Sequence, residues 1–351
     1  MKKAVSLLCI AVALMLMGCV ADVPGDTTAA TDMPSTGNTT SAETEPTTET
    51  QAPTQSATIL TETTAPAESP YHEDIMAVPM VRVMGMLYVL DKEENSLMQQ
   101  LPGGYVYLGY CFEDNNSIPQ ANNGSRHIPR YTEIYASPDN PDYVYYDTGE
   151  GYQRLIRAAL VENEVSRRDP DNTAPESYTL AFFSTLLRVD SHNPYNQATG
   201  QEFYQPEGID LYLLFYNGFT EWSYYNVPLT AEEEAFLAAR GWGENKPMSN
   251  AERFPISAMD KRLQRFFGIT FAQSWKSGLD RMAHYREENQ CYYQWRSDVR
   301  GDQITVSSVE FDAARNAYYI THELADTGSK YCMTLIKTDG VLQIYSNVSV
   351  E

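Results

Sequence analysis

Thiol and imidazole groups are the side chains of this sequence best suited to chemistry. Cys291 and His284 lie seven residues apart, and a thiol nucleophile activated by a histidine base would use such a pair. The two groups must also meet in space, with a third group orienting the imidazole, and spacing along the chain does not establish that. No two histidines have metal-ligand spacing. We therefore expect neither a metal site nor a cofactor; the histidines are His72, His127, His192, His284 and His322.

Carboxylates offer a second kind of chemistry, since the chain holds 47 Asp and Glu residues. A glycosidase needs two carboxyl groups facing each other, about 5–5.5 Å apart if retaining and about 6.5–9.5 Å if inverting. Glu221, beside Trp222, is the acid that we nominate, and the sequence does not identify its partner. The motifs of P-loops, Rossmann folds, zinc proteases and serine hydrolases are missing from the sequence.

Aromatic residues are concentrated in two segments, 212–225 and 291–295. Tyr and Trp combine an apolar ring with a polar tip, so exposed rings stack on sugars and anchor protein interfaces. Half-buried strands also use these residues, and most of the rings are then part of the core. If a surface patch exists, we expect its ligand contacts at Trp222, Tyr224 and Tyr225.

The amino terminus carries the pattern of a secretory signal. Lys2 and Lys3 precede the uncharged run 4–17, which is shorter than the ~20 apolar residues that span a bilayer. The run ends in Leu16-Met17-Gly18-Cys19. This motif resembles the bacterial lipobox, although Met17 departs from its usual residue. The resemblance implies a signal peptide over 1–19 and a diacylated Cys19 that anchors the protein to the extracytoplasmic face of the cell membrane.

Residues 20–70 have the composition of a disordered stalk. They contain no aromatic residue, no Lys and no Arg, and Thr, Pro, Ser, Ala and Glu dominate. Such a segment buries too little apolar surface to offset the entropy of ordering it. The net charge is −22, of which the signal contributes +2 and the stalk −8, so residues 71–351 carry −16. Nucleic acid would repel so acidic a domain, and we expect no nucleic-acid partner.

Strand-like segments separated by turns fill residues 71–170. Residues 153–165 instead place Leu155, Ile156, Ala159 and Leu160 at helical spacing, which predicts an amphipathic helix. We therefore expect a small antiparallel β module that ends in a helix. Its strands are predicted at 81–90 with a bend at Gly85, at 105–110, at 133–136 and at 143–146.

Residues 171–351 begin with helical signals. Thr230 and Glu233 form a capping box for a helix over 231–240. Ser257 is the expected cap of a second helix over 258–267, which Gly268 ends. The apolar runs 178–189 and 209–216 fit either a helix or a strand.

The chain ends in a series of strands, predicted at 303–311, 317–324, 330–337 and 341–350. Asp339-Gly340 marks a hairpin between the last two. Helices followed by antiparallel strands indicate an α+β fold, with the helices packed on a C-terminal meander. NTF2-like and cystatin-like domains share that order. Cys291 and Cys332 both lie in strand-like segments, and the sequence leaves open whether they pair.

Three segments carry a family resemblance: 228–237, the stretch from Arg253-Phe254-Pro255-Ile256 to 269, and the strand around 83–88. They resemble uncharacterised lipoproteins of Gram-positive, Clostridia-like gut anaerobes. The resemblance implies a surface location and a folded chain in two parts, and it supplies no catalytic residues.

Two functions follow from these features. The first is a non-catalytic binding protein at the cell surface, whose ligand is a glycan, a peptide or another envelope protein. The alternative is a hydrolase directed at the cell wall or another glycan.

Overall fold

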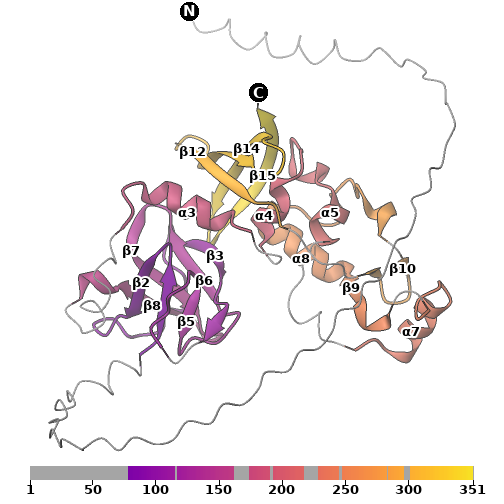
Figure 1. The fold of residues 1–351 in the computed structure, drawn as a ribbon, viewed down its shortest axis with the longest axis horizontal. Coiled ribbons are helices and arrows are strands. Elements are labelled where there is room, and N and C mark those ends of the chain that lie inside the picture. Colours follow the sequence, from indigo (N-terminus) through magenta and orange to yellow (C-terminus); the bar gives the residue numbers. More distant parts are fainter. Residues whose placement is uncertain are drawn as a thin grey trace, which may run out of the picture. The chain divides into compact units, whose positions relative to one another are not determined.

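The structure is a computed structural model that describes residues 78–114, 117–161, 174–189, 193–216, 228–244, 247–282, 284–295 and 301–350. Its elements confirm the α+β fold, with antiparallel sheets and few helices (Figure 1). The lipobox, the stalk and the boundary expected after residue 170 lie outside the described residues.

An eight-stranded sheet dominates the first part, in the spatial order β3-β6-β7-β8-β2-β1-β5-β4. It is antiparallel except for the parallel pair β4 and β5. The predicted bend is the β1–β2 turn, where Met84 and Gly85 both have positive φ. The bounds are β1 Met80–Val83, β2 Met86–Leu90, β3 Val106–Tyr110, β4 Glu113–Asp114, β5 Gly124–Arg126, β6 Glu133–Ser137, β7 Asn140–Asp147 and β8 Tyr152–Arg157.

The helix predicted over 153–165 is wrong, because the chain forms β8 there and then one 3-10 turn, Ala158–Leu160. Strand β8 pairs with β7 on one side and with β2 on the other. Leu155 belongs to the main core, whereas Ile156 packs against a smaller cluster. Leu155 and Ile156 thus pack on opposite faces of the sheet. Adjacent apolar residues of this kind also occur on one face of a helix, so the sequence pattern alone did not distinguish the two structures.

The two ambiguous runs both contain helices, α3 Tyr178–Leu186 and α5 Leu211–Tyr216. Helix α4, Pro194–Thr199, lies between them in sequence. Helix α7, Ala231–Ala238, has the predicted capping box, with both Thr230–Glu233 hydrogen bonds formed.

Helix α8, Ile256–Phe267, ends at Gly268 as predicted, with a left-handed φ of 68°. The cap expected at Ser257 is wrong, because the helix starts at Ile256, two residues earlier than predicted, and Pro255 is its N-cap. Pro255 is also the last residue of strand β9, Ala251–Pro255, so the strand passes directly into the helix.

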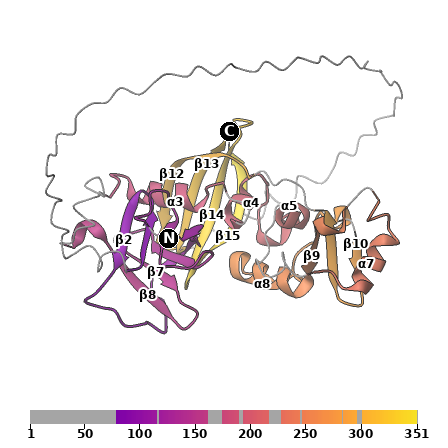
Figure 2. The ribbon, with the colours of Figure 1, turned by 60° about the horizontal axis from the view of Figure 1, so that its bottom comes forward.

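The four C-terminal strands form the predicted antiparallel meander, in the order β12-β13-β14-β15. Helix α3 packs against β12, while α8 and α4 pack against β15 (Figure 2). The predicted Asp339-Gly340 turn joins the last two strands, and Gly340 accepts a hydrogen bond from Tyr107 N at 3.0 Å. The bounds are β12 Ile304–Asp312, β13 Ala317–Leu324, β14 Lys330–Thr338 and β15 Val341–Val350.

A third sheet has three strands, in the order β10-β11-β9, where β10 is His284–Arg286 and β11 is Cys291–Trp295. Helix α7 and this sheet share a small core that contains Leu237, Trp242 and Tyr293. Cys291 lies in this sheet and Cys332 in the meander, and both are free thiols, as is the buried Cys111.

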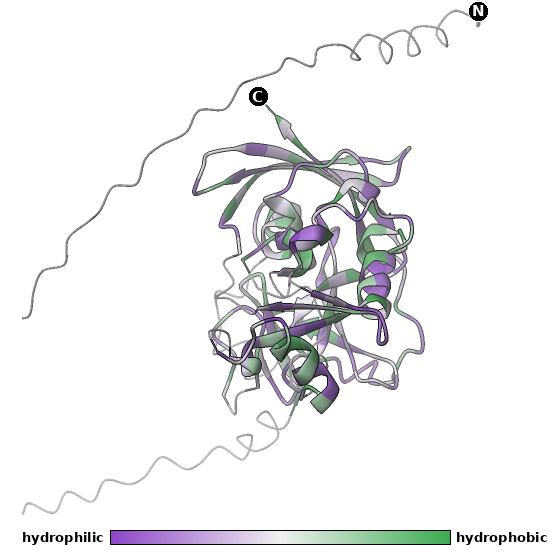
Figure 3. Ribbon diagram, turned by 90° about the vertical axis from the view of Figure 1, so that its right-hand side faces the viewer, coloured by the Kyte–Doolittle hydropathy of each residue, from purple (hydrophilic) through white to green (hydrophobic). Residues whose placement is uncertain are grey.

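One large core connects the eight-stranded sheet, the central helices and the meander. Its members include Tyr107 from β3, Phe183 from α3, Phe266 from α8 and Ile344 from β15, all at most 2 % exposed. Hydrophobic and hydrophilic residues mix along the same strands and helices, as expected for elements with one buried side (Figure 3).

Asn347 should be a determinant of stability, because its buried amide nitrogen joins β15 to the end of α4. This atom lies 3.3, 2.9 and 2.8 Å from the carbonyl oxygens of Ala198, Thr199 and Gln201. Asn347→Ala should lower the free energy of unfolding by about 1–3 kcal/mol, because buried carbonyls lose their partner. Urea unfolding measures this change, and the exposed strand variant Thr305→Ala is the control. Equal midpoints for the two variants would contradict the prediction.

Candidate functional site

Two arginines on α8 face the eight-stranded sheet. Arg262 and Arg265 are three residues apart and therefore lie on one side of the helix. Arg262 is 6 % exposed, and its side chain shares the buried face of α8 with Leu263 and Phe266. Arginine so deeply buried needs polar partners, and those partners define the site.

Glu133 on β6 forms a two-pronged ion pair with Arg265. The two guanidinium nitrogens of Arg265 donate to the two carboxylate oxygens of Glu133 at 2.8 and 2.7 Å. Tyr135 donates its hydroxyl to the same carboxylate. Bidentate pairing of this type is both stronger and more directional than a single contact. We call the Glu133–Arg265 pair the clasp, since it joins residues 132 positions apart.

The pKa values of both clasp residues are shifted so that their charged forms are favoured. Burial alone would raise the pKa of Glu133, but the hydrogen bonds and charge of Arg265 outweigh it, so this pKa lies below its ordinary value. Burial likewise opposes the charge of Arg265, and Glu133 outweighs that effect and raises the pKa of the guanidinium. Both groups therefore stay ionised at neutral pH.

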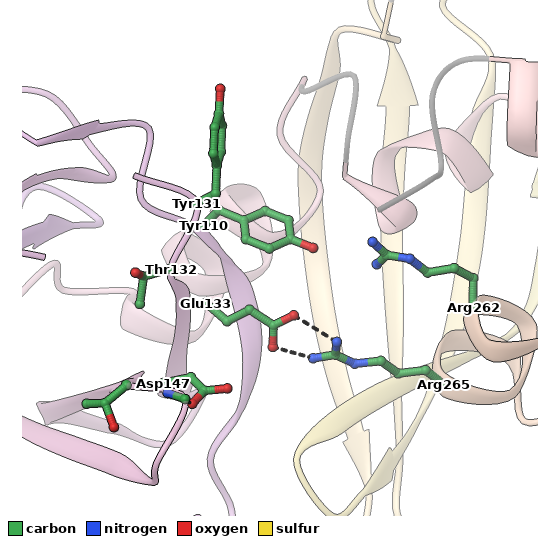
Figure 4. A pocket seen from close by; sticks show the side chains of 9 residues that line it. Tyr110, Tyr131, Thr132, Glu133, Asp147, Arg262 and Arg265 are labelled. Atoms are coloured by element: carbon green, nitrogen blue, oxygen red, sulfur yellow. Dashed lines mark hydrogen bonds and ion pairs between the residues drawn. The ribbon is translucent and has the colours of Figure 1, made fainter. Parts of the chain in front are cut away.

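A hollow of about 460 Å³ opens beside the clasp, and we call it the junction pocket. In Figure 4, Tyr110 and Glu133 point from the sheet toward Arg262 and Arg265, whereas the ring of Tyr131 points away from both arginines. Burial opposes the charge of Arg262, but its electrostatic interaction and hydrogen bond with Tyr110 outweigh burial and raise the pKa of the guanidinium. The pocket is lined by Tyr110, Tyr131, Thr132, Glu133, Asp147, Thr148, Gly149, Arg262 and Arg265.

Tyr131, at the rim of this pocket, has a strained backbone. Its φ is 70°, in the left-handed region that bulky residues rarely adopt. Two backbone hydrogen bonds hold the turn: Tyr131 N donates to Cys111 O at 2.7 Å, and Cys111 N donates to Thr132 O at 3.0 Å. The guanidinium of Arg130 lies 4.7 Å from the centre of the Tyr131 ring. A strained backbone persists only where surrounding contacts hold it in place, and such residues are found most often at active sites and ligand sites.

The junction pocket supplies fixed hydrogen-bonding groups and is poorly suited to proton transfer. A general acid needs a pKa near the working pH, and Arg265 moves the pKa of Glu133 the other way. Both oxygens of Glu133 already accept hydrogen bonds, which also makes it a weak nucleophile. The geometry therefore favours recognition of a polar ligand.

The thiol chemistry considered for Cys291 and His284 finds no support in the structure. Burial raises the pKa of Cys291 to about 11, so the reactive thiolate is scarce at neutral pH. His284 pairs with Tyr293 across the β10–β11 ladder, and its ring contacts Phe236 and Trp242.

The aromatic segments are mostly core where the structure describes them. Phe215, Cys291 and Tyr293 are buried, and Tyr212 stacks on Tyr216 with ring centres 4.9 Å apart. The contacts nominated from the sequence, Trp222, Tyr224 and Tyr225, lie outside the described residues, as do Glu221 and the lipid-bearing Cys19.

Sequence reasoning missed the arginines of the junction pocket, although a signal was present. The apolar stripe of the predicted helix runs through Met259, Leu263 and Phe266, and Arg262 falls within that stripe. A charged residue at a core position is informative because it needs a partner on another element. Its partner Tyr110 and the clasp partner Glu133 carry no comparable signal.

Comparisons with known proteins assign no family to the chain: no family model, no curated protein and no solved structure matches it. The NTF2-like or cystatin-like architecture and the lipoprotein resemblance therefore stay predictions. Among the described residues, no group of three or more His, Cys, Asp or Glu side chains is arranged to hold a metal ion. None of the described helices is long and apolar enough to cross a membrane.

The clasp should make stability depend on pH. Glu133 has a lowered pKa in the folded state, so its contribution exists above the ordinary glutamate pKa of about 4.3 and is lost as pH falls through the lower folded value. Glu133→Gln should cost about 1–2 kcal/mol at pH 7, and its difference from the wild type should shrink from pH 5 to pH 3.

Urea unfolding at several pH values measures this difference. The exposed turn variant Glu150→Gln is the control for removing one carboxylate. A Glu133→Gln variant with the wild-type pH profile would show that the clasp contributes nothing through its charge.

Proposed function

We propose that this chain is a lipid-anchored protein of the extracytoplasmic membrane face that binds an envelope ligand and does not convert it. The observation that carries the binding role is the junction pocket, where Arg265 holds Glu133 ionised beside Arg262 and Tyr110. A pocket of fixed charges and hydroxyl groups orients a ligand at little reorganisation cost.

The groups of the pocket fit a glycan best among the candidate ligands. Guanidinium, carboxylate, phenol and threonine groups together offer donors and acceptors, which a molecule rich in hydroxyl groups can satisfy. Two carboxylates, Glu133 and Asp147, and two arginines, Arg262 and Arg265, line the pocket. Their formal charges balance, so the pocket does not require a strongly charged ligand. Trp222, Tyr224 and Tyr225 remain proposed as further contacts.

The proposed lipid anchor supports a ligand of the cell envelope. A signal-like run that ends in Cys19, followed by a stalk without apolar clusters, fits a tether that keeps the folded chain near the membrane. The acidic net charge argues against nucleic acid as partner. For the hydrolase alternative, the nominated Glu221 lies outside the described residues, and the lowered pKa of Glu133 in the junction pocket does not suit a general acid.

Cys19→Ser should abolish anchoring, because the Cys19 thiol is the proposed acylation site. We expect that the variant protein carries no radiolabelled palmitate. We also expect the protein to move from the membrane fraction to the medium. Cys9→Ser, inside the signal, is the matched control and should leave both unchanged. A Cys19→Ser protein that keeps its lipid label would refute the anchor.

Tyr110→Phe should weaken binding of the full chain to isolated cell walls by about 2- to 12-fold, since it removes one hydrogen bond worth ~0.5–1.5 kcal/mol and keeps the ring. Sedimentation with purified walls, in mild detergent, measures the affinity. Tyr319→Phe on β13 is the control, and the triple alanine variant of Trp222, Tyr224 and Tyr225 tests the sequence-derived contacts.

Two outcomes would contradict this proposal. Absence of wall binding by the wild type would remove the recognition function. Soluble sugars released in proportion to time and enzyme concentration would establish the hydrolase alternative.

A further inference from the structure

Three exposed aromatic side chains belong to segments that border one hollow of the surface. Trp275 is 64 % exposed, Tyr204 70 % and Tyr345 44 %. Tryptophan is normally well buried, and single exposed apolar residues need no explanation. Tyr345 lines the hollow, Tyr204 directly precedes its lining residue Gln205, and Trp275 is bonded to its lining residue Glu207. Exposed rings on the segments around one hollow are a feature of binding surfaces.

The hollow has a volume of about 300 Å³ and lies between the end of α8, the β14–β15 hairpin and a 3-10 turn, Pro206–Gly208. Phe203 pairs with Asn347 in an antiparallel bridge, which places Tyr204 and Gln205 alongside β15. The hollow is lined by Gln205, Pro206, Glu207, Phe267, Gly268, Ile269, Ile336, Gln343, Ile344 and Tyr345.

Trp275 is held against this turn with one side covered and the rest open. Its backbone nitrogen donates to Glu207 O at 2.9 Å. Its ring packs so closely on Gly208 that a Cβ added there would lie 3.0 Å from Cζ3 and 3.4 Å from Cε3. The loop before it is braced by Thr270 and Gln273, whose side chains each accept the backbone N–H of the other. The indole is therefore pre-positioned without its outer side being buried.

Tyr204 is also fixed in place. Its hydroxyl donates to Glu202 Oε1 at 3.1 Å, and Ser349 Oγ on β15 donates to the same oxygen at 2.8 Å. A ring held in this way loses little conformational entropy when a ligand stacks on it.

We infer that Trp275, Tyr204 and Tyr345 form a stacking platform for an uncharged glycan chain, with Gln205, Glu207 and Gln343 bonding its hydroxyl groups. Pyranose rings have an apolar C–H face that packs on aromatic rings and a rim of hydroxyls that amides and carboxylates bind. None of the residues that line this hollow is Lys or Arg, and Glu207 would repel a phosphate- or carboxylate-bearing polymer. This inference rests on the proposed function and assigns the ligand class and a second contact surface.

Gly208→Ala is a milder test, because it leaves the indole in the protein and shifts it only by a few tenths of an ångström. Trp275→Ala removes the ring, and Trp275→Tyr restores an aromatic face. Phe311→Ala is the matched control, since Phe311 is 50 % exposed on β12, at the opposite edge of the meander from β15.

The full chain in mild detergent would be assayed by affinity electrophoresis with two neutral polysaccharides, a β-linked glucan and chitin oligomers, and with anionic polygalacturonate. We expect retention by a neutral glycan, at least tenfold weaker binding for Trp275→Ala, a smaller loss for Gly208→Ala, and partial recovery for Trp275→Tyr. Phe311→Ala should bind as the wild type does, and polygalacturonate should retain none of the proteins.

Wild-type affinity in both Trp275→Ala and Gly208→Ala would overturn the platform and leave the proposed function standing. Binding to cell walls without binding to either neutral glycan would have the same meaning. A wild-type protein that binds neither walls nor glycans would overturn the platform and the proposed function together.

Discussion

An unpaired carboxylate at the position of Glu133 would be costly, because its side chain is only 19 % exposed and the rings of Tyr107, Tyr135 and Phe266 lie beside the clasp. The guanidinium of Arg265 lies about as far from Tyr107 as from Phe266, at 5.0 and 5.1 Å from their ring centres. Removing one partner of such a pair leaves a partly buried charge without its counter-ion, which is a larger loss than the net value of the pair. The clasp thereby fixes the position of α8 on the eight-stranded sheet.

Both candidate ligand surfaces depend on that position of α8. Arg262 and Arg265 reach the junction pocket, while Phe267 and Gly268, at the end of the same helix, line the second hollow. Gln343 of β15 donates to Gln264 O at 3.2 Å and so ties the last turn of α8 to the meander. The left-handed Gly268 then turns the chain away at once. Helix α8 therefore contributes to two surfaces whose other lining residues come from distant segments of the sequence.

Local signals predicted the fold where local interactions decide it. The Thr230–Glu233 capping box and the Asp339-Gly340 hairpin are short-range features, and the structure contains both. The error at 153–165 arose because β7 and β2, which pair with β8, are not visible from its own spacing. Arg262 was readable as a charge within an apolar stripe. The placement of Trp275 was not readable, since its ring packs on Gly208, which lies 67 residues away in the sequence.

The charge of the chain constrains how a ligand is recognised. Residues 71–351 carry −16, so an anionic wall polymer approaches against a repulsive field. At physiological ionic strength that field decays within about 8 Å, and only short-range contacts remain to provide affinity. Ring stacking and hydrogen bonds to uncharged hydroxyl groups are contacts of this kind. The proposed platform of Trp275, Tyr204 and Tyr345 would therefore bind its ligand with little dependence on salt, in contrast to a surface that attracts its partner through net charge.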